Sequence, residues 1–288
     1  MGVLSNKIER EELKPGDHIY SWRTAYIYAH HGIYVGDGMV IHFTRAAGQE
    51  TGTGTILDRV LFSSSPSNMG IVCERCGDQS NLHGVINSCL DCFLAGGNLY
   101  LFNYSVSLAF FLAKARGGTC TLATSDPAVI VLHRAKYLLD NGFGTYSLFK
   151  NNCEDFAIYC KTGLLVVTEF SLGRSGQLAS FSAAISAVTS SPLRYLTTGA
   201  TGLTVLAGGM YCIGRYVSDI GIRRDVIKIP VANLVARARI EGPAAAAAAE
   251  ATIAATAVAA AAAAAAVTTV ATEVVMEAGA TEMECCAA

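Results

Sequence analysis

The stretch from His30 to His42 constrains the fold more than any other part of this 288-residue chain. β-Branched and aromatic residues lie on both sides of a Gly-Asp-Gly turn at positions 36–38. That pattern is typical of two antiparallel strands joined by a tight turn, because glycine readily adopts the left-handed backbone that such turns need. The sequence therefore predicts a β-hairpin that carries a histidine at each end.

The length of the turn decides which histidines share a face of this hairpin. A three-residue loop pairs Gly32 with His42 and places His42 diagonal to His30 on one face. A two-residue loop would pair Ile33 with His42 and would select His31 instead. Because Gly32 leaves space beside the imidazoles, we favour the first register. We then expect His31 to point to the opposite face of the strand.

Turn residues and hydrophobic periodicity predict the other elements of the first half of the chain. We expect strands at 18–22 and 98–104, and helices at 107–116, 127–141 and 153–161. Strands and helices mixed in this way indicate the α+β class. The predicted fold is a small antiparallel sheet packed on helices.

Cys153 stands at the predicted start of a helix, directly after a capping residue, Asn152. The unpaired amides and the positive dipole end of a helix stabilise a thiolate there and make it more nucleophilic. Taken alone, a free cysteine is most often a small buried hydrophobic residue. A cysteine nucleophile also needs a base and a group that orients the base. A histidine pair on one face of the hairpin supplies both.

Three blocks of sequence resemble the lecithin retinol acyltransferase (LRAT) domain family. They are KPGD at 14–17, HHGIYVGDGMVIH at 30–42 and YSLFKNNCEDF at 146–156. The resemblance covers a domain of about residues 13–170. It implies a permuted papain-like fold of the NlpC type, in which the histidines precede the cysteine in the chain.

The same resemblance implies a role for each matching residue. The first histidine of the family motif is the base, and the second, twelve positions further along the chain, orients it, so the resemblance selects His30 and His42. Cys153 matches the nucleophile. Backbone amides near the start of its helix are then expected to stabilise the oxyanion of the tetrahedral intermediate.

The chain also departs from the common pattern of the family. His31 stands where most members have tryptophan, and Asp155 stands where animal members often have histidine. An insertion at 63–120 separates the two motifs. These features resemble the plant branch of the family.

The activity that the resemblance implies is acyl transfer or hydrolysis on lipid esters, through a thioester on the cysteine. The expected partners are a lipid acyl donor, a lipid acyl acceptor and a membrane surface. Two other functions stay open: an NlpC-type amidase or peptidase, and a non-catalytic membrane-associated adaptor. The sequence does not identify a protein partner.

The insertion carries four cysteines in two pairs with the spacing of a zinc site. They are Cys73, Cys76, Cys89 and Cys92. Two Cys-x-x-Cys pairs with twelve residues between them suit one tetrahedral Zn²⁺ held by four thiolates. Disulfides or unliganded thiols are the alternatives. Four thiolates leave no open position on the metal, so we expect a structural zinc and no cofactor for catalysis. His83, between the pairs, is interpreted as a solvated loop residue.

Charge and hydropathy bear on the partners and location of the protein. The chain has 21 Lys and Arg against 23 Asp and Glu, so no basic surface is expected and nucleic acid is excluded as a partner. The first twelve residues lack the apolar segment of a secretory signal, which predicts a cytoplasmic protein.

The C-terminal part of the chain is expected to associate with a membrane. Residues 175–225 are predicted as a hydrophobic helical region, in which the uncharged run 195–214 is long enough to span a bilayer. Its five glycines make its hydropathy marginal, and a buried or interfacial helix pair is a close alternative. Residues 243–288 form an alanine-rich tail of low complexity.

Overall fold

A computed structural model describes most of the first 166 residues and one later segment of the chain. The described residues are 6–23, 28–44, 73–78, 82, 84–114, 116–144, 152–166 and 200–238. The predictions for the first five residues, for His83, for residues 175–199 and for the alanine-rich tail lie outside them.

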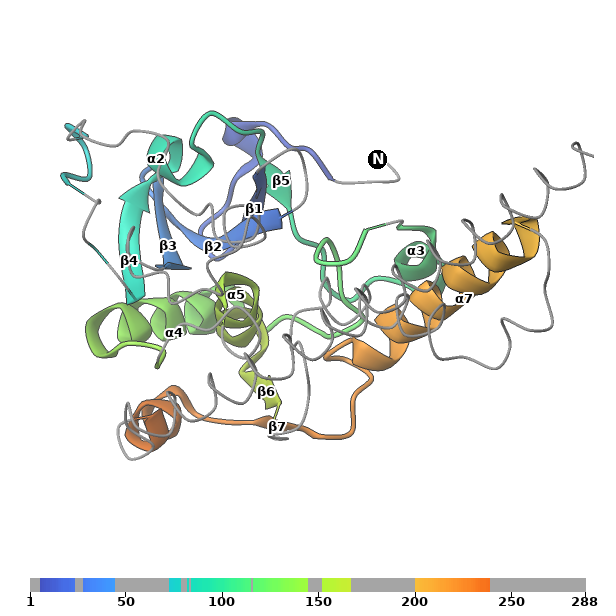
Figure 1. The fold of residues 1–288 in the computed structure, drawn as a ribbon. Helices are drawn as coiled ribbons and strands as arrows, with labels where there is room; N and C mark the ends of the chain where they lie inside the picture. The colour runs from blue at the N-terminus through green and yellow to red at the C-terminus, as the bar shows by residue number, and fades with distance from the viewer. Residues whose placement is uncertain are drawn as a thin grey trace, which may run out of the picture. The chain divides into compact units, whose positions relative to one another are not determined.

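A five-stranded antiparallel sheet carries the site (Figure 1). In the order of the sheet, its strands are β4 (Gly84–Cys89), β3 (Met39–Thr44), β2 (Tyr28–Gly36), β1 (His18–Arg23) and β5 (Tyr100–Leu101). A second, two-stranded sheet pairs β6 (Leu164–Val166) with β7 (Val226–Lys228). The predicted small antiparallel sheet with helices is confirmed.

The helical elements of the described residues are the 3₁₀ turn η1 (Arg10–Glu12), α2 (Leu90–Leu94), α3 (Leu108–Ala113), α4 (Ala128–Asn141), α5 (Cys153–Thr162) and α7 (Ala200–Ser218). The helices predicted at 107–116, 127–141 and 153–161 are confirmed as α3, α4 and α5, with ends within three residues of those expected, whereas η1 and α2 were not predicted. Pro127 occupies the N-cap position of α4 and Gly142 its C-cap. Gly163 ends α5 in the left-handed conformation, where glycine has no steric cost.

The turn of the hairpin is one residue shorter than the sequence predicted. Gly36 pairs with Met39, which leaves a two-residue loop of Asp37 and Gly38. Both loop residues have positive φ, 52° and 67°, as in the turn type whose twist matches that of the two strands. The expectation of a three-residue loop is therefore wrong.

The predicted register of the histidines is nevertheless confirmed. The pairing shifts by one residue between Tyr34 and Gly36, at a β-bulge, and the shift restores Gly32 opposite His42. Gly32 is also needed there, because a β-carbon at this position would lie 2.9 Å from the ring of Phe93 and 3.1 Å from the β-carbon of His42.

Each face of the sheet has its own hydrophobic cluster. Ile33, Ile41 and Phe43 pack with side chains of α4 and α5, and the ring of His31 stacks on Tyr20 within that layer. On the other face, Ile19 and Val40 pack with α2 and with residues next to it. The ring of His30 contacts Phe93 of α2. His30 and His31 therefore point to opposite faces, as predicted.

The segment that was predicted as an insertion belongs to the sheet itself. Its described residues supply β4 and β5, which are the two edge strands, and also α2 and α3. The cysteine pairs consequently lie at one edge of the sheet, next to β3.

The end of α7 packs against the region around α3. Arg215 is buried, its guanidinium donates to the carbonyl of Lys114, and its charge lies 4.5 Å from the centre of the Phe111 ring. Among the described residues, no helix combines the length and the apolar character needed to cross a bilayer. A bilayer-spanning helix is thus not found in the described part of 175–225.

Candidate functional site

Three polar side chains from neighbouring strands form a chain of hydrogen bonds. Nε2 of His30 on β2 lies 2.9 Å from Nδ1 of His42 on β3. Nε2 of His42 lies 2.8 Å from the hydroxyl oxygen of Ser88 on β4. The structure thus brings the two predicted histidines together and adds Ser88, which the sequence analysis missed. No motif marked this serine, because its strand was not predicted.

Burial keeps both imidazoles of the pair neutral. Desolvation lowers the pKa of His30 well below its ordinary value of 6.5, and the charges of His42 and Arg23 lower it further. Desolvation, with a contribution from Arg23, lowers the pKa of His42 to about 3. A neutral imidazole has one nitrogen with a lone pair and can accept a proton, as a general base must.

The hydrogen bonds allow one arrangement of protons that leaves His30 ready to act as a base. If His42 carries its proton on Nε2 and donates to Ser88, its Nδ1 accepts from Nε2 of His30. Nδ1 of His30 then holds a lone pair. This atom is buried and has no hydrogen-bond partner among the described residues. The orphaned nitrogen is the expected proton acceptor of the site.

Cys153 is the first residue of α5, as predicted. The side chain of Asn152 caps the helix, and the Asp155 carboxylate accepts a hydrogen bond from the backbone N–H of Asn152, which completes a capping box. The Cys153 thiol is buried and lies 3.8 Å from the carbonyl oxygen of Ala29, the residue next to His30. The helix start therefore brings the thiol to the backbone of β2 at the residue that precedes His30.

Two of the amides expected to stabilise an oxyanion are already engaged. The N–H groups of Glu154 and Asp155 both donate to the side-chain oxygen of Asn152, at 2.9 and 3.1 Å. They can serve an oxyanion only in competition with this cap. The expectation that the helix-start amides form the oxyanion hole is to that extent weakened.

A second buried polar chain lies on the opposite face of β2, and the sequence analysis missed it. Nδ1 of His31 lies 2.9 Å from Nε2 of His18, whose Nδ1 lies 2.8 Å from the Tyr104 hydroxyl. Desolvation lowers the pKa of His31 to about 3 and that of His18 well below 6.5. The sequence analysis did not predict the pairing of β1 with β2. In that pairing His18 lies opposite Ile33, which places His18 diagonal to His31 on the same face.

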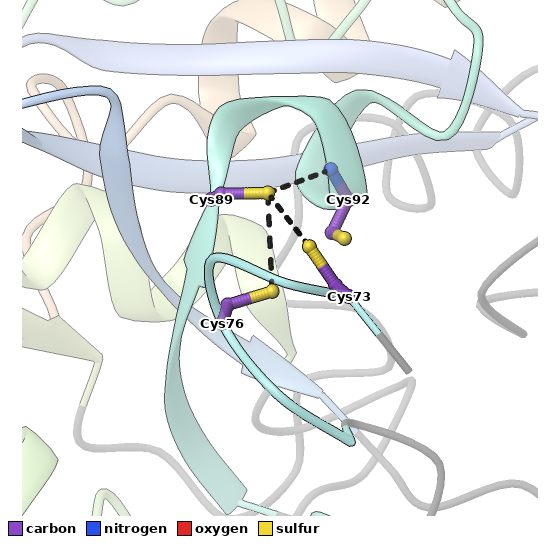
Figure 2. A group of neighbouring side chains, drawn as sticks. All are labelled: Cys73, Cys76, Cys89 and Cys92. Atoms are coloured by element: carbon purple, nitrogen blue, oxygen red, sulfur yellow. Dashed lines mark hydrogen bonds between the residues drawn. The ribbon is translucent and has the colours of Figure 1, made fainter. Parts of the chain in front are cut away.

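The four predicted metal ligands converge at the edge of the sheet (Figure 2). They form the four-cysteine cluster: Cys73, Cys76, Cys89 and Cys92, with all sulfurs within 4.8 Å of one another. The sulfur of Cys89 lies 3.7 Å from that of Cys73 and 3.8 Å from that of Cys76. A tetrahedral zinc with Zn–S bonds of about 2.3 Å places its sulfurs about 3.8 Å apart. The donor set thus has the size and chemistry for such an ion.

Backbone amides stabilise negative charge on the sulfurs of the cluster. Amides of Cys76 and Arg75 lower the pKa of the Cys73 thiol to about 6, and the amide of Cys92 donates to the sulfur of Cys89. Burial and the neighbouring thiols raise the pKa of Cys92. Four thiols this close cannot all ionise unless a cation compensates their charge, which is what a bound divalent metal supplies.

Comparison with known proteins connects this geometry to a family. A model of the family described as "Lecithin retinol acyltransferase" matches residues 11–166. The chain is also similar to "Protein LEAD-SENSITIVE 1" of Arabidopsis thaliana, with 62% identity over 238 residues. The alignment covers 82% of this chain and 92% of the Arabidopsis protein. The matched region contains the sheet, the histidine pair, the four-cysteine cluster and α5.

Proposed function

Because the chain belongs to the lecithin retinol acyltransferase family, we propose that it transfers or hydrolyses acyl groups of lipid esters through a thioester on Cys153. The single observation that carries the proposal is the orphaned Nδ1 of His30. His30 directly follows Ala29, whose carbonyl oxygen lies 3.8 Å from the sulfur of Cys153.

The reaction proceeds in two steps, and His30 accepts and then returns one proton in each. Nδ1 of His30 takes the proton of the Cys153 thiol, and the thiolate attacks the carbonyl carbon of the ester. The carbon–oxygen bond then breaks, and the leaving alcohol takes the proton from His30. In the second step His30 removes a proton from water or from an acceptor alcohol, which attacks the thioester carbon. The carbon–sulfur bond breaks, and the leaving Cys153 thiolate takes the proton back from His30.

His42 has a positioning role in this scheme. Its Nδ1 accepts a hydrogen bond from the N–H at Nε2 of His30. This bond holds the ring of His30 in place and stabilises the imidazolium that forms in each step. His31 cannot share this role, because it faces the opposite side of β2 and bonds to His18. The body of α5 packs on the face of the sheet to which His31 points, so the decisive comparison is His30→Ala against His31→Ala.

The test of the proposal is an acyl adduct on one cysteine. The protein is incubated with a phospholipid, and its intact mass is measured before and after hydroxylamine, which cleaves thioesters. We expect an adduct of one acyl group on Cys153 and none in Cys153→Ala. Cys212→Ala, a half-buried cysteine of α7, is the matched control and should form the adduct normally. An absence of adduct and of turnover with both esters and thioesters would refute the proposal in favour of a non-catalytic adaptor.

We also propose that the four-cysteine cluster holds one structural Zn²⁺. The convergence of the four sulfurs supports this, together with sulfur spacings that match a tetrahedral thiolate site. Four thiolates complete the coordination of the ion, so it takes no part in the acyl chemistry.

We propose in addition that the protein meets its lipid substrate at a membrane surface. Two helices carry exposed apolar pairs one turn apart: Leu108 and Leu112 on α3, and Ile213 and Val217 on α7. Apolar side chains at this spacing lie on one side of a helix and can enter the headgroup region of a bilayer.

A further inference from the structure

The four-cysteine cluster and the histidine pair are joined through one strand. Ser88, whose hydroxyl lies 2.8 Å from Nε2 of His42, directly precedes Cys89 at the end of β4. Ser88 is buried and pairs with Val40, two residues before His42 on β3. A shift of Cys89 therefore moves the hydrogen-bond partner of His42.

Each cysteine pair has a second contact with the histidine hairpin. Beside the first pair, the Arg75 side chain donates to the carbonyl of Asp37 in the hairpin turn, at 3.1 Å. Beside the second pair, the Leu90 amide donates to the carbonyl of Gly38, at 2.8 Å. The ring of Phe93, next to Cys92, lies 5.2 Å from the ring of His30 and 5.4 Å from that of His42. These contacts connect both arms of the cluster to the turn and to the imidazoles.

We propose that the four-cysteine cluster, with a divalent metal bound, holds Ser88 and Phe93 in place and thereby sets the tautomer of the His30–His42 pair. Ser88 is a positioning residue of the site, and the metal acts on the site only through it and through Phe93. The inference rests on the proposed role of His30 for its catalytic meaning, but the structural link that it asserts can be measured without any acyl transfer.

The tautomer follows from the direction of each hydrogen bond. When the Ser88 oxygen accepts from Nε2 of His42, the other nitrogen of that ring must carry a lone pair, because a neutral imidazole has one N–H. Nδ1 of His42 then accepts from Nε2 of His30. The lone pair of His30 is left on Nδ1, the orphaned atom. If Ser88 is displaced, His42 is free to adopt the other tautomer, which donates to His30 and moves the lone pair of His30 to the wrong nitrogen.

The first experiment measures the reactivity of Cys153 without a lipid. The zinc-loaded full-length protein is alkylated with iodoacetamide at pH 7, and the rate at Cys153 is read from peptide masses. We expect Ser88→Ala to slow alkylation at Cys153 about tenfold or more, the usual scale for loss of an orienting partner. Ser88→Thr, which keeps the hydroxyl, should restore most of the rate. Ser88→Ala should still bind one zinc, because it is not a ligand.

The second experiment removes the metal. Cys76→Ser and chelator treatment should both release zinc and slow alkylation of Cys153 at least as much as Ser88→Ala does. Because Ser88 is one of the two residues through which the metal acts, the double variant of Cys76→Ser and Ser88→Ala should be no slower than Cys76→Ser alone. Cys212→Ser is the matched control and should leave both zinc content and rate unchanged.

The third measurement separates this inference from the proposed function. In ¹⁵N spectra of the imidazoles, His42 should be the Nε2–H tautomer in zinc-loaded protein. The spectra of Ser88→Ala and of metal-free protein should show both tautomers. A metal-free protein that stays folded by circular dichroism and keeps the tautomer of His42 overturns the inference. If His30→Ala leaves the rate at Cys153 unchanged while the tautomer still follows the metal, the role of His30 is wrong and the link stands.

Discussion

The imidazole rings of His30 and His42 meet nearly at right angles, at 86°, with Nε2 of one 2.9 Å from Nδ1 of the other. This geometry suits one proton shared along the line between the two atoms, and it leaves only Nδ1 of His30 to accept another. The pair is therefore asymmetric: one histidine can take a proton from a substrate or thiol, and the other can only orient it.

The first prediction follows from this asymmetry. His30→Ala should abolish the acyl adduct on Cys153, because Nδ1 of His30 is the one nitrogen of the pair whose lone pair is not engaged in a hydrogen bond. His42→Ala should reduce it less, since it removes the orienting partner and leaves the acceptor. His31→Ala should have a much smaller effect than His30→Ala. The measurement is the initial rate of adduct formation by intact mass. A larger loss in His31→Ala than in His30→Ala would assign the base to the opposite face of β2.

The hairpin could be predicted from its sequence because its signals are local. A Gly-Asp-Gly turn between β-branched residues identifies the strands, and Gly32 identifies the register because only glycine fits against Phe93. The bulge near Tyr34 could not be predicted, since a two-residue turn with a bulge and a three-residue turn give the same pairing at Gly32. The capped helix of Cys153 was equally local, because Asn152 marks its start.

The missing parts of the site depend on contacts between distant segments. β4 is an edge strand whose pairing with β3 spans a long stretch of chain, and Ser88 acquires its partner only through that pairing. The bond between His18 and His31 likewise needs β1 beside β2. Sequence spacing found the four cysteines, but it gave no sign that β4 would join them to the histidines.

A second prediction concerns stability in acid. The folded protein holds His31 and His42 neutral, with pKa values of about 3, whereas the unfolded chain takes up protons at these positions below about pH 6.5. The free energy of unfolding should therefore fall as the pH decreases from 6.5 toward 3, by about 1.4 kcal/mol per pH unit for each such histidine. Urea unfolding at several pH values measures the slope. His31→Gln should reduce the slope, and the control His133→Gln, on an exposed residue of α4, should reduce it less. If His31→Gln reduced the slope no more than His133→Gln does, the neutral state of His31 in the folded protein would be contradicted.

A third prediction concerns the metal. Purified protein should contain about one equivalent of zinc, and Cys76→Ser should release it, because three thiolates hold zinc less tightly than four. Chelation should lower the thermal midpoint of unfolding, since an ion that binds only the folded state stabilises it. Elemental analysis and thermal scans provide the two measurements, with Cys212→Ser as the control. A zinc content near zero in protein with four reduced thiols would contradict the metal site.

A fourth prediction concerns the membrane surface. Ile213→Glu with Val217→Glu should weaken flotation with phospholipid vesicles, because a charge in the headgroup boundary opposes insertion of the apolar face. Val129→Glu, on an exposed residue of α4, is the matched control and should float as the parent protein does. Equal flotation of the double variant and the parent would exclude this face of α7 as the contact.

The last prediction separates the two roles of Asn152. Its side-chain oxygen accepts bonds from two amides of α5, and a substitution to alanine should lower the free energy of unfolding by about 1 kcal/mol. Asn152→Asp keeps an acceptor in the same place and should retain most of that stability. Its carboxylate, however, adds a negative charge beside Cys153 and opposes formation of the thiolate. Alkylation of Cys153 at pH 7 should consequently be slower in Asn152→Asp than in the parent protein, while urea unfolding shows little change. An unchanged alkylation rate in Asn152→Asp would mean that Cys153 does not react as a thiolate stabilised by the helix start.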